Sequence, residues 1–258
     1  MSEPPFQDGS AGDVDYGVIG VDYAVYRRPD PRIAAQILRA LGDAETVLNV
    51  GAGAGSYEPR DRQVTAVEPS ATMRAQRPAG LPPAIDAVAE ALPFDEGSFD
   101  AVMASSTVHQ WSDLARGIAE MKRVSRGPVV ITASDPVRLL DFWLVDYFPE
   151  PLIVEQSRFP PITRLGELLG PGTRVEHVPI PLDCTDGFTE AYYGRPELLL
   201  EPGVQRAMSS WTLVDPALLR QFEERLSADL ASGAWDGRFG HLRTQPTYDG
   251  SLRLIVRP

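Results

Sequence analysis

Apolar positions along the first half of the chain follow two patterns, short continuous runs and longer stretches with helical spacing. The first helical stretch begins after Asp30 and Pro31 and stops at Gly42. Between them the apolar residues recur every three or four positions: Ile33, Ile37, Leu38 and Leu41. Asp before Pro is a typical helix start and Gly a typical stop, so this segment is predicted to be a helix.

Apolar runs and helical stretches then alternate along the chain. The runs predict strands at residues 46–50, 63–67, 84–88, 99–104 and 128–133. Helical spacing predicts helices at residues 70–76 and 112–124. Parallel strands need crossover connections, which are usually helical and right-handed, so this order predicts an α/β fold with a doubly wound, mostly parallel sheet.

Beyond residue 135 two segments interrupt the alternation. Residues 136–162 are rich in aromatic residues and proline, and residues 183–247 form a long insert. Between and after them, a helix at 163–169 and strands at 174–180 and 251–256 bring the expected sheet to seven strands. Open α/β sheets bind ligands at the carboxyl edge of their strands, so we interpret both segments as helical lid insertions over that edge.

Charge and cysteine content exclude several classes of partner. The 258 residues include 24 Lys and Arg against 36 Asp and Glu, a formal net charge of −12, which disfavours nucleic acid and anionic membranes. The chain has no 18-residue apolar run, and one cysteine, Cys184, with three His residues cannot form an intrachain disulfide or a zinc site. We expect a cytoplasmic protein that binds no metal, and no oligomeric state is predicted.

Alternating glycines carry the strongest chemical signal. The predicted strand at 46–50 runs into Gly51, Gly53 and Gly55, and we call residues 51–55 the glycine loop. Glycines let a backbone turn sharply and approach a ligand closely. Glu68 ends the next predicted strand, where a carboxylate can accept both hydroxyl hydrogens of a ribose. Together they predict a nucleoside site.

The glycine spacing decides between two kinds of nucleoside. A dinucleotide site has the pattern G-x-G-x-x-G with a pyrophosphate over a helix N-terminus, whereas these glycines lie at every second position. We also expect Glu58 in the first turn of a helix after the loop, where its charge would compete with a phosphate. An NAD-dependent oxidoreductase is therefore the less favoured alternative to a site for an adenosyl sulfonium.

Five motifs occur in a fixed order along the predicted core: VGAGAG at 50–55, AVEPS at 66–70, AEALPF at 89–94, SFDAV at 98–102 and HQW at 109–111. This series resembles the class I S-adenosylmethionine-dependent methyltransferases, specifically the small-molecule group called methyltransferase type 11. The resemblance runs from about residue 46 to residue 135. It implies a Rossmann-like sheet, S-adenosyl-L-methionine as cofactor and S-adenosyl-L-homocysteine as product.

The resemblance also implies which residues hold the cofactor. The glycine loop would cradle the methionine half and the ribose, and Glu68 would take the ribose hydroxyls. The implied cofactor-binding residues are Tyr26, Arg28, Asn49, Gly51, Ala52, Gly53, Gly55, Glu68, Pro69, Ser70, Met73, Ala89, Glu90, Ala91 and Ser105. Asn49 and Val88 stand where acidic residues are common in the family, so fewer side chains than usual would contact the cofactor. Arg27 and Arg28 lie just before the first predicted helix and could reach the methionine carboxylate, or could be a solvated charge pair. Tyr26 and Arg28 are in the set because a Tyr/Arg pair in this region contacts the cofactor in related enzymes.

Methyl transfer is an in-line displacement, so catalysis depends mainly on positioning and a base is optional. His109 follows the predicted strand at 99–104 and could deprotonate a hydroxyl or an amine, or could simply line the pocket. Aromatic side chains could form the acceptor pocket or be the core of the lid. The candidate acceptor-binding residues are Tyr23, His109, Trp111, Trp143, Tyr147 and Tyr192.

These observations divide the chain into three expected parts. Residues 1–15 form a disordered polar tail, residues 16–135 a cofactor-binding core, and residues 136–258 the rest of the sheet with the lid around the acceptor pocket. The expected function is methylation of a small organic molecule at oxygen, nitrogen or carbon. A non-catalytic module that binds an adenosyl cofactor stays open as another alternative.

Overall fold

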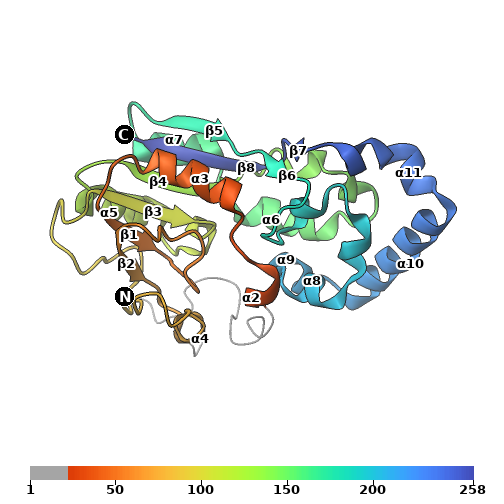
Figure 1. The fold of residues 1–258 in the computed structure, drawn as a ribbon, viewed down its shortest axis with the longest axis horizontal. Helices are drawn as coiled ribbons and strands as arrows, with labels where there is room; N and C mark the ends of the chain where they lie inside the picture. Colours follow the sequence, from red (N-terminus) through yellow and green to blue (C-terminus); the bar gives the residue numbers. More distant parts are fainter. Residues whose placement is uncertain (1–22) are drawn as a thin grey trace.

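A six-stranded sheet forms the centre of the protein in the computed structural model, which describes residues 23–258 (Figure 1). Its strands are β1 (Thr46–Val50), β2 (Gln63–Val67), β3 (Ala101–Ser105), β4 (Val129–Ser134), β5 (Arg174–His177) and β8 (Leu252–Arg257). They are ordered β2-β1-β3-β4-β8-β5. The first four run parallel, and β8 pairs antiparallel with both β4 and β5. The predicted α/β fold with a mostly parallel sheet is confirmed.

Helices cover both faces of this sheet. On one face, Ile33 and Ile37 of α3 (Pro31–Ala40) pack in a cluster with Val47 and Met103. On the other, α5 (Leu114–Val124) and α7 (Ile162–Leu169) pack in a cluster that includes Leu48. Neighbouring strand residues point to opposite faces, so adjacent positions such as Val47 and Leu48 serve different cores. This is the doubly wound arrangement.

Local capping explains where the helices begin. The Asp30 carboxylate accepts a hydrogen bond from the backbone N–H of Arg32 at 2.9 Å, and Pro31 occupies the first helical position of α3. Asp113 caps α5 in the same way, through the N–H of Arg116 at 3.0 Å. These caps satisfy backbone donors that have no partner inside the helix. The predicted start after Asp30 is confirmed, whereas α5 begins two residues later than the predicted 112.

Most of the remaining chain forms helices beside the sheet, and all of them except α10 are short. The α-helices are α2 (Tyr23–Tyr26), α4 (Ala71–Ala75), α6 (Glu150–Arg158), α8 (Pro202–Arg206), α9 (Ser209–Thr212), α10 (Pro216–Ser232) and α11 (Ala234–Phe239). The 3-10 helices are η1 (Val108–Gln110), η2 (Leu139–Asp141), η3 (Trp143–Asp146), η4 (Thr189–Tyr192), η5 (Pro196–Leu200) and η6 (Gly240–Thr244). Figure 1 shows α8 to α11 gathered past the start of β8, at the carboxyl end of the parallel strands. A two-stranded sheet of β6 (Ile180–Pro181) and β7 (Thr247–Tyr248) also belongs to this part.

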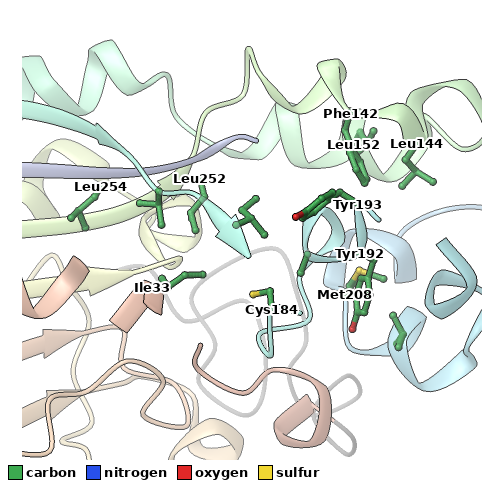
Figure 2. Packing of buried hydrophobic residues seen from close by; sticks show 14 of the residues in the cluster. Ile33, Phe142, Leu144, Leu152, Cys184, Tyr192, Tyr193, Met208, Leu252 and Leu254 are labelled. Atoms are coloured by element: carbon green, nitrogen blue, oxygen red, sulfur yellow. The ribbon is translucent and has the colours of Figure 1, made fainter. Parts of the chain in front are cut away.

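One hydrophobic cluster joins these helices to the sheet. It runs from α3 and the strands through Phe142 and Tyr193 to Trp235 of α11, which is fully buried. Figure 2 labels Phe142, Leu144, Leu152 and Tyr193 of this cluster, together with Leu252 and Leu254 of β8. The second half of the chain therefore shares a continuous core with the sheet.

The sheet has one strand fewer than the seven predicted. The strand expected at residues 84–88 is reduced to a single bridge between Ile85 and Val67. Pro82 and Pro83 come immediately before this segment, and neither has an N–H to donate to the neighbouring strand. The strand expected at residues 174–180 is also divided, into β5 and β6.

Two further expectations concern the first residues of the chain and membrane-spanning helices. The disordered tail predicted at residues 1–15 lies outside the described residues. Among residues 23–258, no helix combines the length and the apolar character that crossing a membrane requires.

Candidate functional site

The glycine loop turns sharply at the carboxyl end of β1. Gly51, Gly53 and Gly55 all have positive φ, at 67°, 51° and 93°. A Cβ atom on Gly51 would lie 2.2 Å from Oγ1 of Thr107, so the loop packs directly against the segment that follows β3. Glycine is required at this position for both its φ angle and its lack of a side chain.

Glu68 lies beside this loop, just after β2. Its Oε2 accepts a hydrogen bond from the N–H of Gly53 at 2.8 Å, and its Oε1 accepts one from the N–H of Ser70 at 2.9 Å. Ser70 in turn caps α4 by accepting from the N–H of Met73 at 3.2 Å. Glu68 is buried, and the two backbone donors hold its carboxylate in one orientation at the loop.

A cavity opens between this loop and the ends of β2 and β3, and we call it the glycine-loop cavity. All of the predicted cofactor-binding residues line it except Tyr26, Arg28, Gly55 and Ala91. The Glu90 carboxylate accepts from Ser112 Oγ at 2.9 Å and from the N–H of Asp113 at 3.0 Å. Its Oε1 therefore helps to hold the start of α5.

The exceptions each have a local reason. Arg28 and Ala91 are exposed, Gly55 faces Leu81 behind the loop, and Tyr26 packs over Gly203 of α8. Arg27, the neighbour of Arg28, lines the cavity instead. Successive residues of an extended segment point to opposite sides, so only one of the two arginines can face inward. Of the two arginines considered from the sequence, Arg27 lines the cavity, and Arg28, the one assigned to the cofactor site, does not.

Arg27 belongs to a polar cluster that the sequence interpretation missed. Its Nε donates to Oδ1 of Asp186 at 2.6 Å, and the Tyr57 hydroxyl donates to Oδ2 of Asp186 at 2.9 Å. Burial and the neighbouring Asp186 raise the pKa of Tyr57, so the phenol keeps its proton. Asp186 is 129 residues from Tyr57 in the sequence, and no local motif announces that the two meet.

The helix expected after the glycine loop, with Glu58 in its first turn, is not formed. Residues 51–57 form turns and no helix follows them before β2, so Glu58 is not in a helical turn. Only seven residues lie between Gly55 and Gln63, and Pro59 is one of them. A pyrophosphate would consequently find no helix N-terminus at this loop, which weakens the dinucleotide alternative further.

Glu58 instead closes a buried network under the loop. Its carboxylate binds both Nη atoms of Arg77 at 2.9 Å, and both side chains are almost fully buried. Glu58 Oε1 also accepts from Nδ2 of Asn49 at 3.1 Å. Because Nδ2 is fixed on the carboxylate, the amide presents Oδ1 on its other side, and that buried atom receives no hydrogen bond from the described residues. Asn49 lines the glycine-loop cavity.

A second cavity adjoins the first. Both are lined by Arg27, Tyr57, Ser105, Ser106 and Asp186. Beyond these shared residues, the second cavity is bounded by side chains from η1, β4, α6 and η4, among them His109, Thr132, Glu155 and Glu190. The two spaces therefore meet at the carboxyl end of β3.

His109 lies in the second cavity. Its ring packs on Phe159 with 4.3 Å between ring centroids, and its buried Nδ1 has no hydrogen-bond partner among the described residues. Burial, with the positive charges of Arg158 and Arg27, lowers the pKa of His109 to about 3. The imidazole is therefore neutral at neutral pH and a weak base.

The other candidate acceptor-binding residues divide into three groups. Trp111 lines the glycine-loop cavity. Trp143, Tyr147 and Tyr192 are buried in the large hydrophobic cluster and line neither cavity. Trp143, for example, packs edge to face on Trp235. The side chain of Tyr23 lies outside the described part of the chain. The helices beside the sheet need these aromatic side chains for their own core.

Comparison with known proteins identifies the family. Residues 48–130 match a family model described as a methyltransferase domain. A crystal structure of a protein from Anabaena variabilis, named as a candidate methyltransferase from an antibiotic biosynthesis pathway, shares 30% sequence identity and a TM-score of 0.84. That match covers 90% of this chain and 99% of the other.

A more distant match shows the fold alone. It is a Thermotoga maritima protein named as an S-adenosylmethionine-dependent methyltransferase and a possible histamine N-methyltransferase. Its TM-score is 0.54 at 15% identity, over 93% of this chain and 95% of that one.

Proposed function

This chain belongs to the class I S-adenosylmethionine-dependent methyltransferases, and from that premise we propose that it methylates a small organic molecule. The observation that carries the proposal is the junction of the two cavities at Ser105, Ser106 and the Arg27–Asp186 pair. A methyl donor in one cavity and an acceptor in the other would face each other there. The products would be the methylated acceptor and S-adenosylhomocysteine.

The residues of the glycine-loop cavity fit an adenosyl cofactor. Glu68 offers a fixed carboxylate suited to two ribose hydroxyls, and the glycines allow close approach of the ligand to the backbone. The unsatisfied Oδ1 of Asn49 is the kind of buried acceptor that a ligand N–H can complete. S-adenosylmethionine, when bound, supplies an electrophilic methyl group.

The chain itself contributes position and enclosure. In-line transfer needs the nucleophile and the methyl carbon held in contact and aligned, which can supply a large part of the rate enhancement. The second cavity lies among β3, β4, α6 and η4, so an acceptor atom must be part of a molecule that fits inside this space. A small organic acceptor fits this enclosure, and the net charge of −12 disfavours nucleic acid.

Calorimetric titration tests the cofactor half of this proposal. We expect S-adenosylhomocysteine to bind and NAD to give no heat. In a separate unfolding measurement, S-adenosylhomocysteine at 100 times its dissociation constant should raise the free energy of unfolding by about 2.7 kcal/mol. Glu68→Ala should raise the dissociation constant at least 100-fold, because it removes the charged acceptor and releases the N–H of Gly53. Glu224→Ala, at an exposed position of α10, is the control. Binding of NAD but not of S-adenosylhomocysteine would refute the proposal.

The acceptor half is tested by turnover. The protein is incubated with S-adenosylmethionine and a panel of small amines, phenols, alcohols and carboxylic acids, and release of S-adenosylhomocysteine is measured. We expect release above the rate without acceptor for at least one chemical class. Tight cofactor binding without release for any class would favour the non-catalytic module.

A further inference from the structure

Two carboxylates mark the second cavity, the half-buried Glu155 and the buried Glu190. Glu155 of α6 accepts at Oε1 from Ser210 Oγ at 3.0 Å, and no described residue donates a hydrogen bond to its Oε2. Glu190 of η4 is 2% exposed and accepts from the N–H of Ser251 at 2.9 Å and from the Ser251 hydroxyl. Neither residue belongs to a motif of the sequence, and neither contributes to the glycine-loop cavity.

The charges lining this cavity are unequal. Its described walls hold three carboxylates, Glu155, Glu190 and Asp186, and two guanidiniums, Arg27 and Arg158. Arg27 is bound to Asp186 at 2.6 Å. Burial raises the pKa of Glu155, and burial with the nearby charge of Glu155 raises the pKa of Glu190 to about 7. Raised pKa values mean that both carboxyls ionise less readily than usual, and a ligand cation beside them would stabilise their ionised forms.

Two other basic residues near this cavity, Arg253 and His109, do not neutralise the carboxylates. Arg253 lies near Glu190, but its Nη1 donates to the carbonyls of Gly250 and Leu252 and it pairs with Asp249 at 3.6 Å. His109 is neutral and adds no positive charge.

The rest of the wall is part apolar and part hydroxyl-bearing. Ile33 and Ile37 of α3 face the cavity together with Phe159, Phe188 and Leu252. The Ser105 and Thr132 hydroxyls, also on the wall, bond to each other at 2.8 Å. A ligand that matches this surface has an apolar body and a positively charged group.

We propose that the second cavity binds the methyl acceptor as an amine with an apolar body, and that Glu155 pairs with its ammonium group and takes its proton. The inference rests on the proposed function and adds the class of acceptor and the identity of the proton acceptor. Glu155 is assigned rather than Glu190 because its Oε2 has no donor among the described residues. Both carboxylate oxygens of Glu190 already accept hydrogen bonds from Ser251.

The proton and electron balance is simple. The N–H bond of the ammonium breaks, the proton goes to Glu155 Oε2, and nitrogen keeps the electron pair. That pair forms the bond to the methyl carbon while sulfur keeps the pair of the broken S–C bond, which gives an N-methylammonium product and S-adenosylhomocysteine. Glu155 returns its proton to solvent when the product leaves. A carboxylate whose pKa is raised suits this role better than His109, whose pKa is about 3.

Binding of matched probes tests the class of acceptor. The protein is saturated with S-adenosylhomocysteine and titrated calorimetrically with 2-phenylethylamine, 2-phenylethanol and phenylacetate, which share an aromatic body and differ in charge. We expect the amine to bind at least tenfold more tightly than the alcohol and the acid. Equal or tighter binding of the alcohol or the acid, or no binding of the amine, would overturn the inference while the proposed function stands. Failure of S-adenosylhomocysteine to bind would instead remove the proposed function.

Substitutions test whether Glu155 is the residue that pairs with the ammonium group. Glu155→Gln should reduce the advantage of the amine over the alcohol to threefold or less and leave binding of S-adenosylhomocysteine unchanged, which also reports that the variant is folded. Glu150→Gln, on the same helix but outside the cavity lining, should keep the full advantage. An undiminished advantage in Glu155→Gln would overturn the assignment. Should that variant not fold, Ser210→Ala removes the hydrogen bond that orients Glu155, and an unchanged advantage there would count against the assignment in the same way.

Discussion

At the scale of single residues, burial moves two groups of the second cavity in opposite directions. It lowers the pKa of His109 to about 3 and raises the pKa of Glu190 to about 7, because a low-dielectric surrounding disfavours the charged form of each. Both changes favour neutral side chains in the folded protein. Each also makes the stability of the protein depend on pH, with opposite sign.

The ionised carboxylate of Glu190 lowers the free energy of unfolding at high pH. Its pKa rises from 4.5 to about 7, so the folded state holds more protons than the unfolded state across that range, and the free energy of unfolding falls as pH rises through it. The full effect is about 3 kcal/mol. Glu190→Gln is neutral at every pH, so its free energy of unfolding relative to the unaltered protein should increase by most of that amount between pH 5 and pH 8.

Urea denaturation of both proteins at the two pH values measures this difference, and the contribution of His109 cancels because both proteins contain it. Glu150→Gln serves as the control. A difference between Glu190→Gln and the unaltered protein that stays constant with pH would show that Glu190 is already ionised at pH 5 in the folded protein.

At the scale of elements, the link from β1 to β2 is unusual in having no helix. The buried pair of Glu58 and Arg77 fixes this link, since Arg77 comes from the segment after α4 and also donates to the carbonyl of Pro82 at 3.0 Å. The pair thereby connects the glycine loop to the chain that follows α4. Its bidentate geometry holds Asn49 in place as well.

We expect Arg77→Ala to destabilise the protein by about 3–5 kcal/mol, because it leaves the Glu58 carboxylate buried without its cation. Arg164→Ala breaks an ion pair whose two side chains are 52% and 66% exposed, and it should cost less than about 0.5 kcal/mol. Urea denaturation at pH 7 compares the two variants. Similar losses would mean that the pair under the loop contributes no more than an exposed one.

What the sequence predicted well at this scale is local. The helix after Asp30, the strand before the glycine loop and the position of Glu68 depend on residues within one or two turns of each other, and the structure has all three. The second cavity could not be predicted in this way. Its walls come from η1, α6 and η4, which meet only through tertiary packing, and Glu155 has no motif around it. The aromatic residues were equally ambiguous, because a core and a pocket use the same residue types.

At the scale of the whole molecule, two features tie the halves of the chain together. One is the hydrophobic cluster that runs from α3 to α11. The other is β8, formed by residues 252–257, which lies between β4 and β5 and pairs with both. Leu254, Ile255 and Val256 are fully buried. A fragment that ends at residue 135 would lack both features.

We therefore expect deletion of residues 251–258 to abolish cooperative folding. It removes the partner of β4 and β5 and exposes the apolar surface that Leu254, Ile255 and Val256 cover. Thermal unfolding followed by circular dichroism, together with titration of S-adenosylhomocysteine, measures the effect. Deletion of Pro258 alone, which is exposed and lies beyond β8, should change neither. A sigmoidal transition in the longer deletion would show that the remaining strands suffice.

The central place of β8 also sets the order of events on the ribosome. The 117 residues between Ser134 and Leu252 take on the order of ten seconds to translate. During that time the edge of β4 lacks its partner β8, and so does β5 once residues 174–177 have been made. Unpaired edges recruit other strands, so the nascent protein is most prone to aggregation in this interval. The six-stranded sheet closes only after residues 252–257 have been made and have paired with both strands.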